Sequence, residues 1–162
     1  GMTSVKWIKS IQVLDHAFMG YHQTSYYVFV PEGATGDQPN ERVTSLRVKS
    51  LISHPVRGQY VTAGQVMIEG MAWSGNGPID KLEISTDDGK SWQEARVKPS
   101  PSPYAWQSWK YTWEANTPGN YLVRSRATDL KGDTQPAQTQ WNFRGFANNA
   151  IHVVPVIVRP KS

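Results

Sequence analysis

The side chains best suited to metal or acid–base chemistry are few and scattered in this sequence of 162 residues. The histidines follow no metal-ligand spacing, and no cysteine is present to complete a set. They are His16, His22, His54 and His152. The sequence therefore predicts no metal site, no thiolate chemistry and no disulfide framework. We assign no catalytic, cofactor-binding or metal-binding residue.

Asp87 and Asp88 resemble the paired carboxylates of a general acid and base, but their setting favours a turn. They lie between Ser85 and Trp92, before Gly89, and Asp and Gly both tolerate the positive φ of a tight turn. The segment also fits the Asp-box pattern Ser-x-Asp-x-Gly-x-Ser/Thr-Trp, in which the Asp binds backbone and the Trp packs below. Propellers repeat this pattern, whereas it occurs once here. We predict a structural hairpin turn.

The seven tryptophans suggest either core packing or a surface on which sugars stack. Three border alternating strands and are expected in the core: Trp73, Trp92 and Trp141. Trp106 and Trp109 follow a proline-rich loop and are expected to be exposed. With Tyr104 they support an alternative function, a free-standing carbohydrate-binding or adhesion sandwich.

The charge pattern and the length of the apolar runs argue against two classes of partner, nucleic acids and membranes. The net charge is +4 and the isoelectric point is near 9.4, but Lys and Arg are scattered singly. This pattern predicts no nucleic-acid partner. No apolar run reaches the roughly 18 residues that span a membrane, so no membrane partner is predicted either.

Apolar residues alternate with polar ones in short runs separated by Gly, Pro and Asp, which favours an all-β fold. Strands are expected at 46–52, 66–73, 81–85, 94–97, 108–113, 121–127, 139–143 and 151–158. Pro155 implies an edge or a bulge in the last strand. The spacing predicts an antiparallel sandwich rather than alternating strands and helices.

Tyr121 and Val123 carry a signature of immunoglobulin-like sandwiches. In these folds a tyrosine stands two residues before a core position, and its hydroxyl binds backbone at the preceding corner. We therefore expect Tyr121 to bind backbone upstream, and Val123 and Trp73 to be buried between two sheets.

Residues 3–45 differ from the regular pattern that begins at Leu46. Their apolar side chains follow no clean period, the run 26–30 is β-prone, and residues 32–40 have the composition of a loop. This front segment carries more aromatic surface than a free terminus should. It either packs on the main domain or belongs to a neighbour that this chain lacks.

Five motifs occur in order over about half of the chain and together resemble one family. They are Gly70-x-Ala72-Trp73-Ser74-Gly75, the hairpin 84–92, Ala105-Trp106-x-x-Trp109, Arg126-Ala127-x-Asp129-x-x-Gly132-x-x-Gln135-Pro136, and Trp141-Asn142-x-x-Gly145-x-x-Asn148-x-x-x-His152. Residues 4–8 also resemble the end of that family's cofactor domain. The chain resembles the C-terminal dimerisation domain of the sulfite oxidase family of molybdenum-cofactor oxidoreductases.

The resemblance implies an immunoglobulin-like antiparallel β-sandwich of the early-set type with an N-terminal extension. It also implies a non-catalytic domain that forms a homodimer and is joined to a catalytic molybdenum-cofactor domain of the same polypeptide, a molybdenum-dependent oxidoreductase. On this basis residues 1–2 are a tag scar, 3–45 the tail of the missing cofactor domain with a linker, and 46–162 the dimerisation domain. The compartment stays open, and the bacterial periplasm is compatible with the resemblance.

In that family molybdenum is held by a pterin dithiolene and by a cysteine of the cofactor domain, so no cofactor is expected in this fragment. The end of this chain is similar to the end of the domain in sulfite oxidases. In sulfite oxidases an arginine follows a Trp-His pair there and binds sulfite. Here Ile151 and His152 are followed by Val153. The parent enzyme is therefore expected to bind sulfite weakly, to prefer another substrate, or to bind the anion through another residue, such as Arg144, in place of that arginine.

Overall fold

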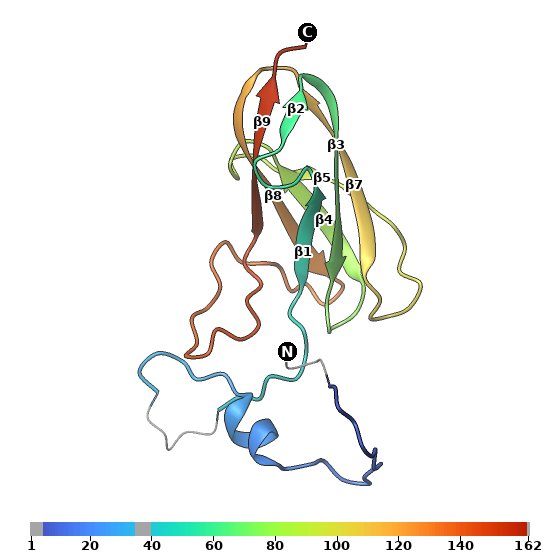
Figure 1. The fold of residues 1–162 in the computed structure, drawn as a ribbon, viewed down its shortest axis with the longest axis vertical. Helices are drawn as coiled ribbons and strands as arrows, with labels where there is room; N and C mark the ends of the chain where they lie inside the picture. The colour runs from blue at the N-terminus through green and yellow to red at the C-terminus, as the bar shows by residue number, and fades with distance from the viewer. Residues whose placement is uncertain (1–4, 35–39, 162) are drawn as a thin grey trace.

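The computed structural model describes residues 5–34 and 40–161. Two sheets face each other across one core (Figure 1). One has the order β1 (Lys49–His54), β3 (Gly64–Trp73), β7 (Gln107–Ala115) and β6 (Arg96–Val97). The other has the order β2 (Tyr60–Thr62), β9 (His152–Arg159), β8 (Gly119–Asp129), β4 (Ile79–Ser85) and β5 (Gln93–Glu94). The predicted all-β sandwich is confirmed.

The core forms because alternate residues of each strand face the opposite sheet. In β3 the inward positions include Val66, Ile68 and Ala72, and in β8 they include Val123 and Ala127. Gly70 also faces inward, and it is needed because a Cβ there would lie 1.9 Å from the Leu51 carbonyl oxygen. The period-2 pattern of the sequence therefore matches the alternation of buried and outward residues in these strands.

Two short strands depart from the prediction. β2 pairs with β9 in parallel, although a wholly antiparallel sandwich was expected. The run predicted at 94–97 is divided, since β5 pairs with β4 whereas β6 pairs with β7 in the other sheet. Ala95 between them is buried. The chain crosses between sheets here, and two residues on each side are too few to show a period.

The last two predicted strands, 139–143 and 151–158, have different outcomes. No strand forms at 139–143; instead Asn142 binds the backbone of Phe146 through both its amide oxygen and its amide nitrogen, which stabilises a loop. The closing strand exists as β9. Pro155 lies in the part of β9 that β2 does not reach, because their pairing begins at Ile157, so the edge expectation is confirmed.

The tyrosine corner is present. The Tyr121 hydroxyl donates to the Thr117 carbonyl at 2.8 Å, and the ring packs edge-on against Trp113 with centroids 4.9 Å apart. Val123 is fully buried as expected. Trp73 was expected beside it in the core, but that prediction is wrong: Trp73 is an outward-facing residue of β3 and only half-buried.

The front segment lies below the sandwich in Figure 1 and is not part of either sheet. Its regular element is a short π-helix, η1 (His22–Tyr26), which replaces the start of the β-prone run predicted at 26–30. A single bridge pairs Val28 with Arg42. Expectations for residues 1–4 and for most of the loop 32–40 fall outside the described residues, at 1–4 and 35–39.

Candidate functional site

The aromatic platform predicted from Tyr104, Trp106 and Trp109 does not exist as a unit. Trp109 is 1% exposed in the core, so the prediction that it is exposed is wrong. Its register position opposite Gly70 explains the burial, because only a glycine leaves room for an indole there. Trp106 is exposed as predicted, and its ring stacks on Trp73 at a centroid distance of 4.2 Å. Sequence alternation alone cannot tell which face of a strand turns inward.

The two other tryptophans predicted for the core are not buried. Trp92 is half-buried, and the guanidinium of Arg126 lies 4.1 Å from its ring centroid. Trp141 is 56% exposed in the loop before β9. Both predictions were wrong because these residues follow or precede strands, where the period-2 rule no longer applies.

The Asp87 turn is confirmed as a structural unit. One carboxylate oxygen accepts from the Ser85 hydroxyl at 2.7 Å and from the Ser91 N–H at 2.9 Å, and the other accepts from the Ser91 hydroxyl at 2.6 Å. The Ser91 hydrogen bonds hold the pKa of Asp87 well below its usual range. Asp88 has positive φ and pairs with Arg124. The Asp87 carboxylate is thus engaged within the turn, and the Asp88 carboxylate joins the turn to β8.

No cluster of three or more His, Asp or Glu side chains able to hold a metal is found among residues 5–34 and 40–161. His152 instead joins the sheets, since its Nδ1 accepts from the Ile52 N–H at 3.0 Å. Burial, and secondarily the charge of Lys49, lowers the pKa of His152. With no cysteine in the sequence, the chain does not fit the thiolate-bound molybdenum of the resembling family.

Gln135 is a buried organising residue that sequence reasoning quoted within a motif without giving it a role. Its Oε1 accepts from the N–H groups of Ser50 and Ala127 at 2.8 and 3.0 Å. Its Nε2 donates to the carbonyls of Asn149 and Ala150. One amide therefore ties β1, β8 and the approach to β9 together. The position of Gln135 next to Pro136 within the motif was the signal in the sequence that could have pointed to this role.

Asp129 has a similar buried role in the same motif. Its Oδ2 accepts from the Ser74 hydroxyl at 2.7 Å, and its Oδ1 accepts from the N–H groups of Lys131 and Asp133. This arrangement links the loop after β3 to the turn after β8. Ser74 and Asp129, which belong to two of the motifs, thus meet at one end of the sandwich.

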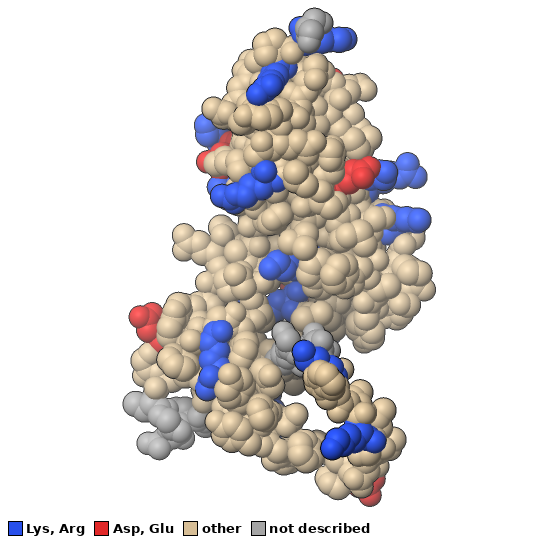
Figure 2. All heavy atoms as spheres, in the orientation of Figure 1, with Lys and Arg blue, Asp and Glu red and all other residues tan. Residues whose placement is uncertain are grey.

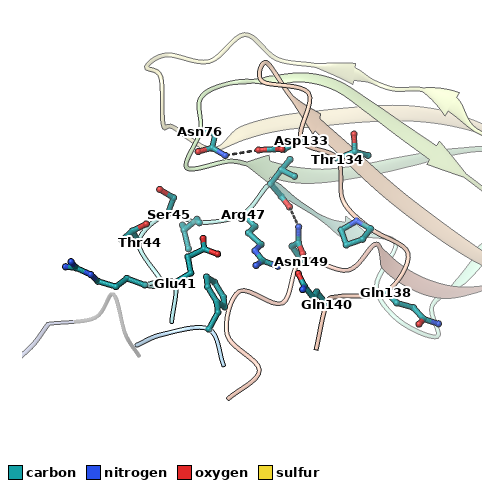
Figure 3. Close-up of a pocket in the computed structure, with 15 residues that line it drawn as sticks. Glu41, Thr44, Ser45, Arg47, Asn76, Asp133, Thr134, Gln138, Gln140 and Asn149 are labelled. Atoms are coloured by element: carbon teal, nitrogen blue, oxygen red, sulfur yellow. Dashed lines mark hydrogen bonds between the residues drawn. The ribbon is translucent and has the colours of Figure 1, made fainter. Parts of the chain in front are cut away.

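A cavity of about 610 Å³ opens at that end, between the front segment and the loop before β9. Arg47 and Asn149 point toward the same part of it in Figure 3. Arg47 lies 4.7 Å from the centroid of the Phe29 ring. Asn149 donates to the Val48 carbonyl, and its Oδ1 has no hydrogen-bond partner among the described residues. The walls are mostly polar, which suits contact with another polar surface.

Val153 is half-buried on the outer face of β9, opposite Arg124 of β8. Arg124 is engaged with Asp88. Arg144, the residue considered as a substitute cation, stacks on Tyr26 of the front segment at 4.0 Å. Arg124 is therefore the cation opposite Val153 in the strand register, a pairing that sequence reasoning missed.

The front segment exposes an unusual amount of apolar surface. The exposed fractions are 87% for Trp7, 82% for Ile11 and 93% for Val13. The visible face has no large basic patch, because the Lys and Arg side chains in Figure 2 are spread over it. No helix of the described residues is long and apolar enough to cross a membrane.

Comparison with known proteins matches this architecture. The family model described as the Mo-co oxidoreductase dimerisation domain matches residues 40–159. Mitochondrial sulfite oxidase of Mus musculus is 30% identical over 99% of this chain and 32% of its own length, and sulfite oxidase of Gallus gallus is 29% identical over 94% and 36%. The chain thus spans about a third of these relatives.

Among solved structures, the sulfane dehydrogenase SoxCD from Paracoccus pantotrophus is similar, with a TM-score of 0.71 and 27% identity. The alignment covers 86% of this chain and 36% of that chain. Because the family model matches most of the chain, including both sheets, the chain belongs to the family of Mo-co oxidoreductase dimerisation domains.

Proposed function

We propose that this chain is the part of a longer molybdenum-cofactor oxidoreductase that pairs two subunits. The observation that carries the proposal is the family match over residues 40–159, which includes both sheets. The carbohydrate-binding alternative loses its basis because Trp109 is buried. In this proposal the fragment has no catalytic role of its own, and the parent polypeptide is the enzyme.

Sedimentation velocity on the chain and on its parent polypeptide tests the pairing. We expect a dimer of the parent and a weaker dimer of the chain, because contacts of the rest of the parent strengthen the pair. A stable interface of this kind buries about 800 Å² per partner. A parent that remains monomeric at high micromolar concentration would contradict the proposal.

The division of the chain forms part of the proposal. Residues 3–45 are the tail of a cofactor domain with its linker, and 46–162 are the dimerisation domain. The exposed Trp7, Ile11 and Val13 support this division, because apolar side chains in this number are expected to be covered by protein. Hydrogen exchange tests it: protection of residues 5–14 should rise in the parent polypeptide. Equal exchange in both would contradict the division.

We further propose that molybdenum is bound by the parent outside this chain. The cofactor supplies oxidation–reduction chemistry in the proposed enzyme, while this chain, which has no cysteine, contributes none of its thiolate ligands. Metal analysis separates the two parts. The parent should contain molybdenum, and the isolated chain should contain none after the same expression.

Val153 is relevant to which substrate the parent enzyme binds. An oxyanion such as sulfite needs fixed cationic donors because its desolvation is costly, and valine offers none. We propose that the parent binds sulfite more weakly than its arginine-bearing relatives or prefers a neutral or organic substrate. Steady-state kinetics of the parent with sulfite should show a lower KM in the Val153→Arg variant. Tight turnover of sulfite, unchanged by the substitution, would contradict the assignment.

A further inference from the structure

The outer faces of the two sheets differ in their charge. On the outer face of β1, β3 and β7, apolar side chains such as Met67 alternate with charged ones, and Lys110 pairs with Glu69 at 2.6 Å. Gln65 and Glu114 are bonded on the same face. Charged groups therefore border Met67 on this face, whereas Leu51 and Met71 lie opposite each other in the register without a charge between them.

The outer face of β8 and β9 has an uncharged stripe, which we define as Leu122, Pro155 and Ile157. Leu122 and Pro155 are directly opposite in the register, and Ile157 is opposite Asn120. Leu122 is 38% exposed, and the other two are half-buried. A groove of about 220 Å³ lies along the stripe, with Tyr121 and Val156 among its lining residues.

The arginines that border the stripe each contact another side chain of the same chain. On one side Arg124 binds Asp88, and beyond it Arg126 binds Glu83 at 2.9 Å. On the other side the guanidinium of Arg159 lies 3.6 Å from the centroid of the Tyr60 ring. The stripe is thus an apolar centre with a polar rim, the usual anatomy of a protein interface.

We propose that two copies of this chain pair through the stripe formed by Leu122, Pro155 and Ile157. This inference rests on the proposed function, because the pairing role comes from the family to which the chain belongs. A two-fold interface places the same patch against itself. An uncharged stripe satisfies that condition directly, whereas a charged face would oppose like charges near the axis unless both signs were arranged about it.

The stripe lies away from the front segment, which is proposed to belong to the cofactor domain. In Figure 1, β9 runs upward toward the C-terminus, and the front segment lies at the opposite, lower end of the sandwich. Pro155 and Ile157 are in the half of β9 beyond Val153. Two copies can therefore meet at the stripe without covering the exposed apolar side chains of the front segment.

Sedimentation velocity of Leu122→Glu, in the chain and in the parent polypeptide, tests the stripe. We expect the dimer Kd to rise at least tenfold, since a buried charge would face its own copy. Met67→Glu is the matched control, because Met67 is 42% exposed on the outer face of the other sheet. It should leave the Kd unchanged. Circular dichroism checks that both variants remain folded.

Cross-linking gives a second readout, and it does not require that a charge be introduced into the folded chain. Because the chain has no cysteine, Leu122→Cys and Met67→Cys each introduce a single thiol. A short bis-maleimide should link Leu122→Cys into covalent dimers at least tenfold faster than Met67→Cys. Equal linking, or preferential linking at Met67, would overturn the stripe while leaving dimerisation intact. A monomeric parent polypeptide would instead overturn the proposed function and the stripe together.

Discussion

The sandwich and the front segment treat similar side chains in opposite ways. Trp109 of β7 is 1% exposed, whereas Trp7 of the front segment is 87% exposed. In the sandwich the two sheets cover each other's inner faces, whereas among the described residues no second layer covers residues 5–14. The comparison teaches that an apolar side chain is buried here where a second layer of the fold lies against it, whatever its residue type.

The largest effect should come from removing the two tryptophans in turn. Trp109→Ala should lower the free energy of unfolding by about 3–5 kcal/mol, because it deletes a buried indole and leaves a cavity. Trp7→Ala should change it by less than about 0.5 kcal/mol, as expected for a surface residue. Chemical denaturation of both variants measures the contrast. Similar losses would mean that the front segment contributes to the same cooperative core.

A smaller loss is expected from the buried amide that ties the strands together. Gln135→Leu keeps the approximate volume but leaves the N–H groups of Ser50 and Ala127 without an acceptor, which should cost about 2–4 kcal/mol. Gln138→Leu is the matched control, because Gln138 is exposed. Denaturation with urea compares the two. A loss below about 1 kcal/mol for Gln135→Leu would show that water replaces the amide.

The tyrosine corner should contribute less. Tyr121→Phe removes one hydrogen bond to the Thr117 carbonyl, and water can reach that carbonyl, so the cost should be about 0.5–1 kcal/mol. Tyr104→Phe, at an exposed residue, should be neutral. Thermal melts followed by circular dichroism are sufficient. A neutral Tyr121→Phe would show that ring packing on Trp113 alone maintains the corner.

The smallest effect concerns pH. The pKa of His152 is lowered by burial and then by the Lys49 charge, so the unfolded chain binds the proton more readily. Stability should therefore decline as pH falls below the ordinary histidine value of about 6.5 and stop declining below the folded-state pKa. Protonation also removes the acceptor for the Ile52 N–H.

Urea denaturation between pH 5 and 8 measures this slope. His152→Gln should reduce it, whereas His16→Gln, on an exposed part of the front segment, should leave it as it is. An unchanged slope in His152→Gln would place the pH dependence on other groups.

The six longer strands of the sandwich were predictable because at least five residues of each alternate. The runs that became β1, β3, β4, β7, β8 and β9 were found because each presents a periodic apolar face. The stretch 139–143 misled the prediction, since Trp141 and Phe143 alternate like a strand but are exposed in a loop. Short strands such as β5 have no period, so their pairing depends on neighbours that only the fold supplies.

The sequence by itself determined the fold class, the Asp87 turn, the corner at Tyr121 and the family resemblance, because each depends on residues close together in the chain. Only the tertiary structure decided that Trp109 is buried and Trp73 is outside, because strand pairing sets which face of each strand meets the core. Tertiary structure also brought Gln135 to Ser50 and placed Arg124 opposite Val153. These contacts join residues that are distant in sequence, and no local pattern encodes them.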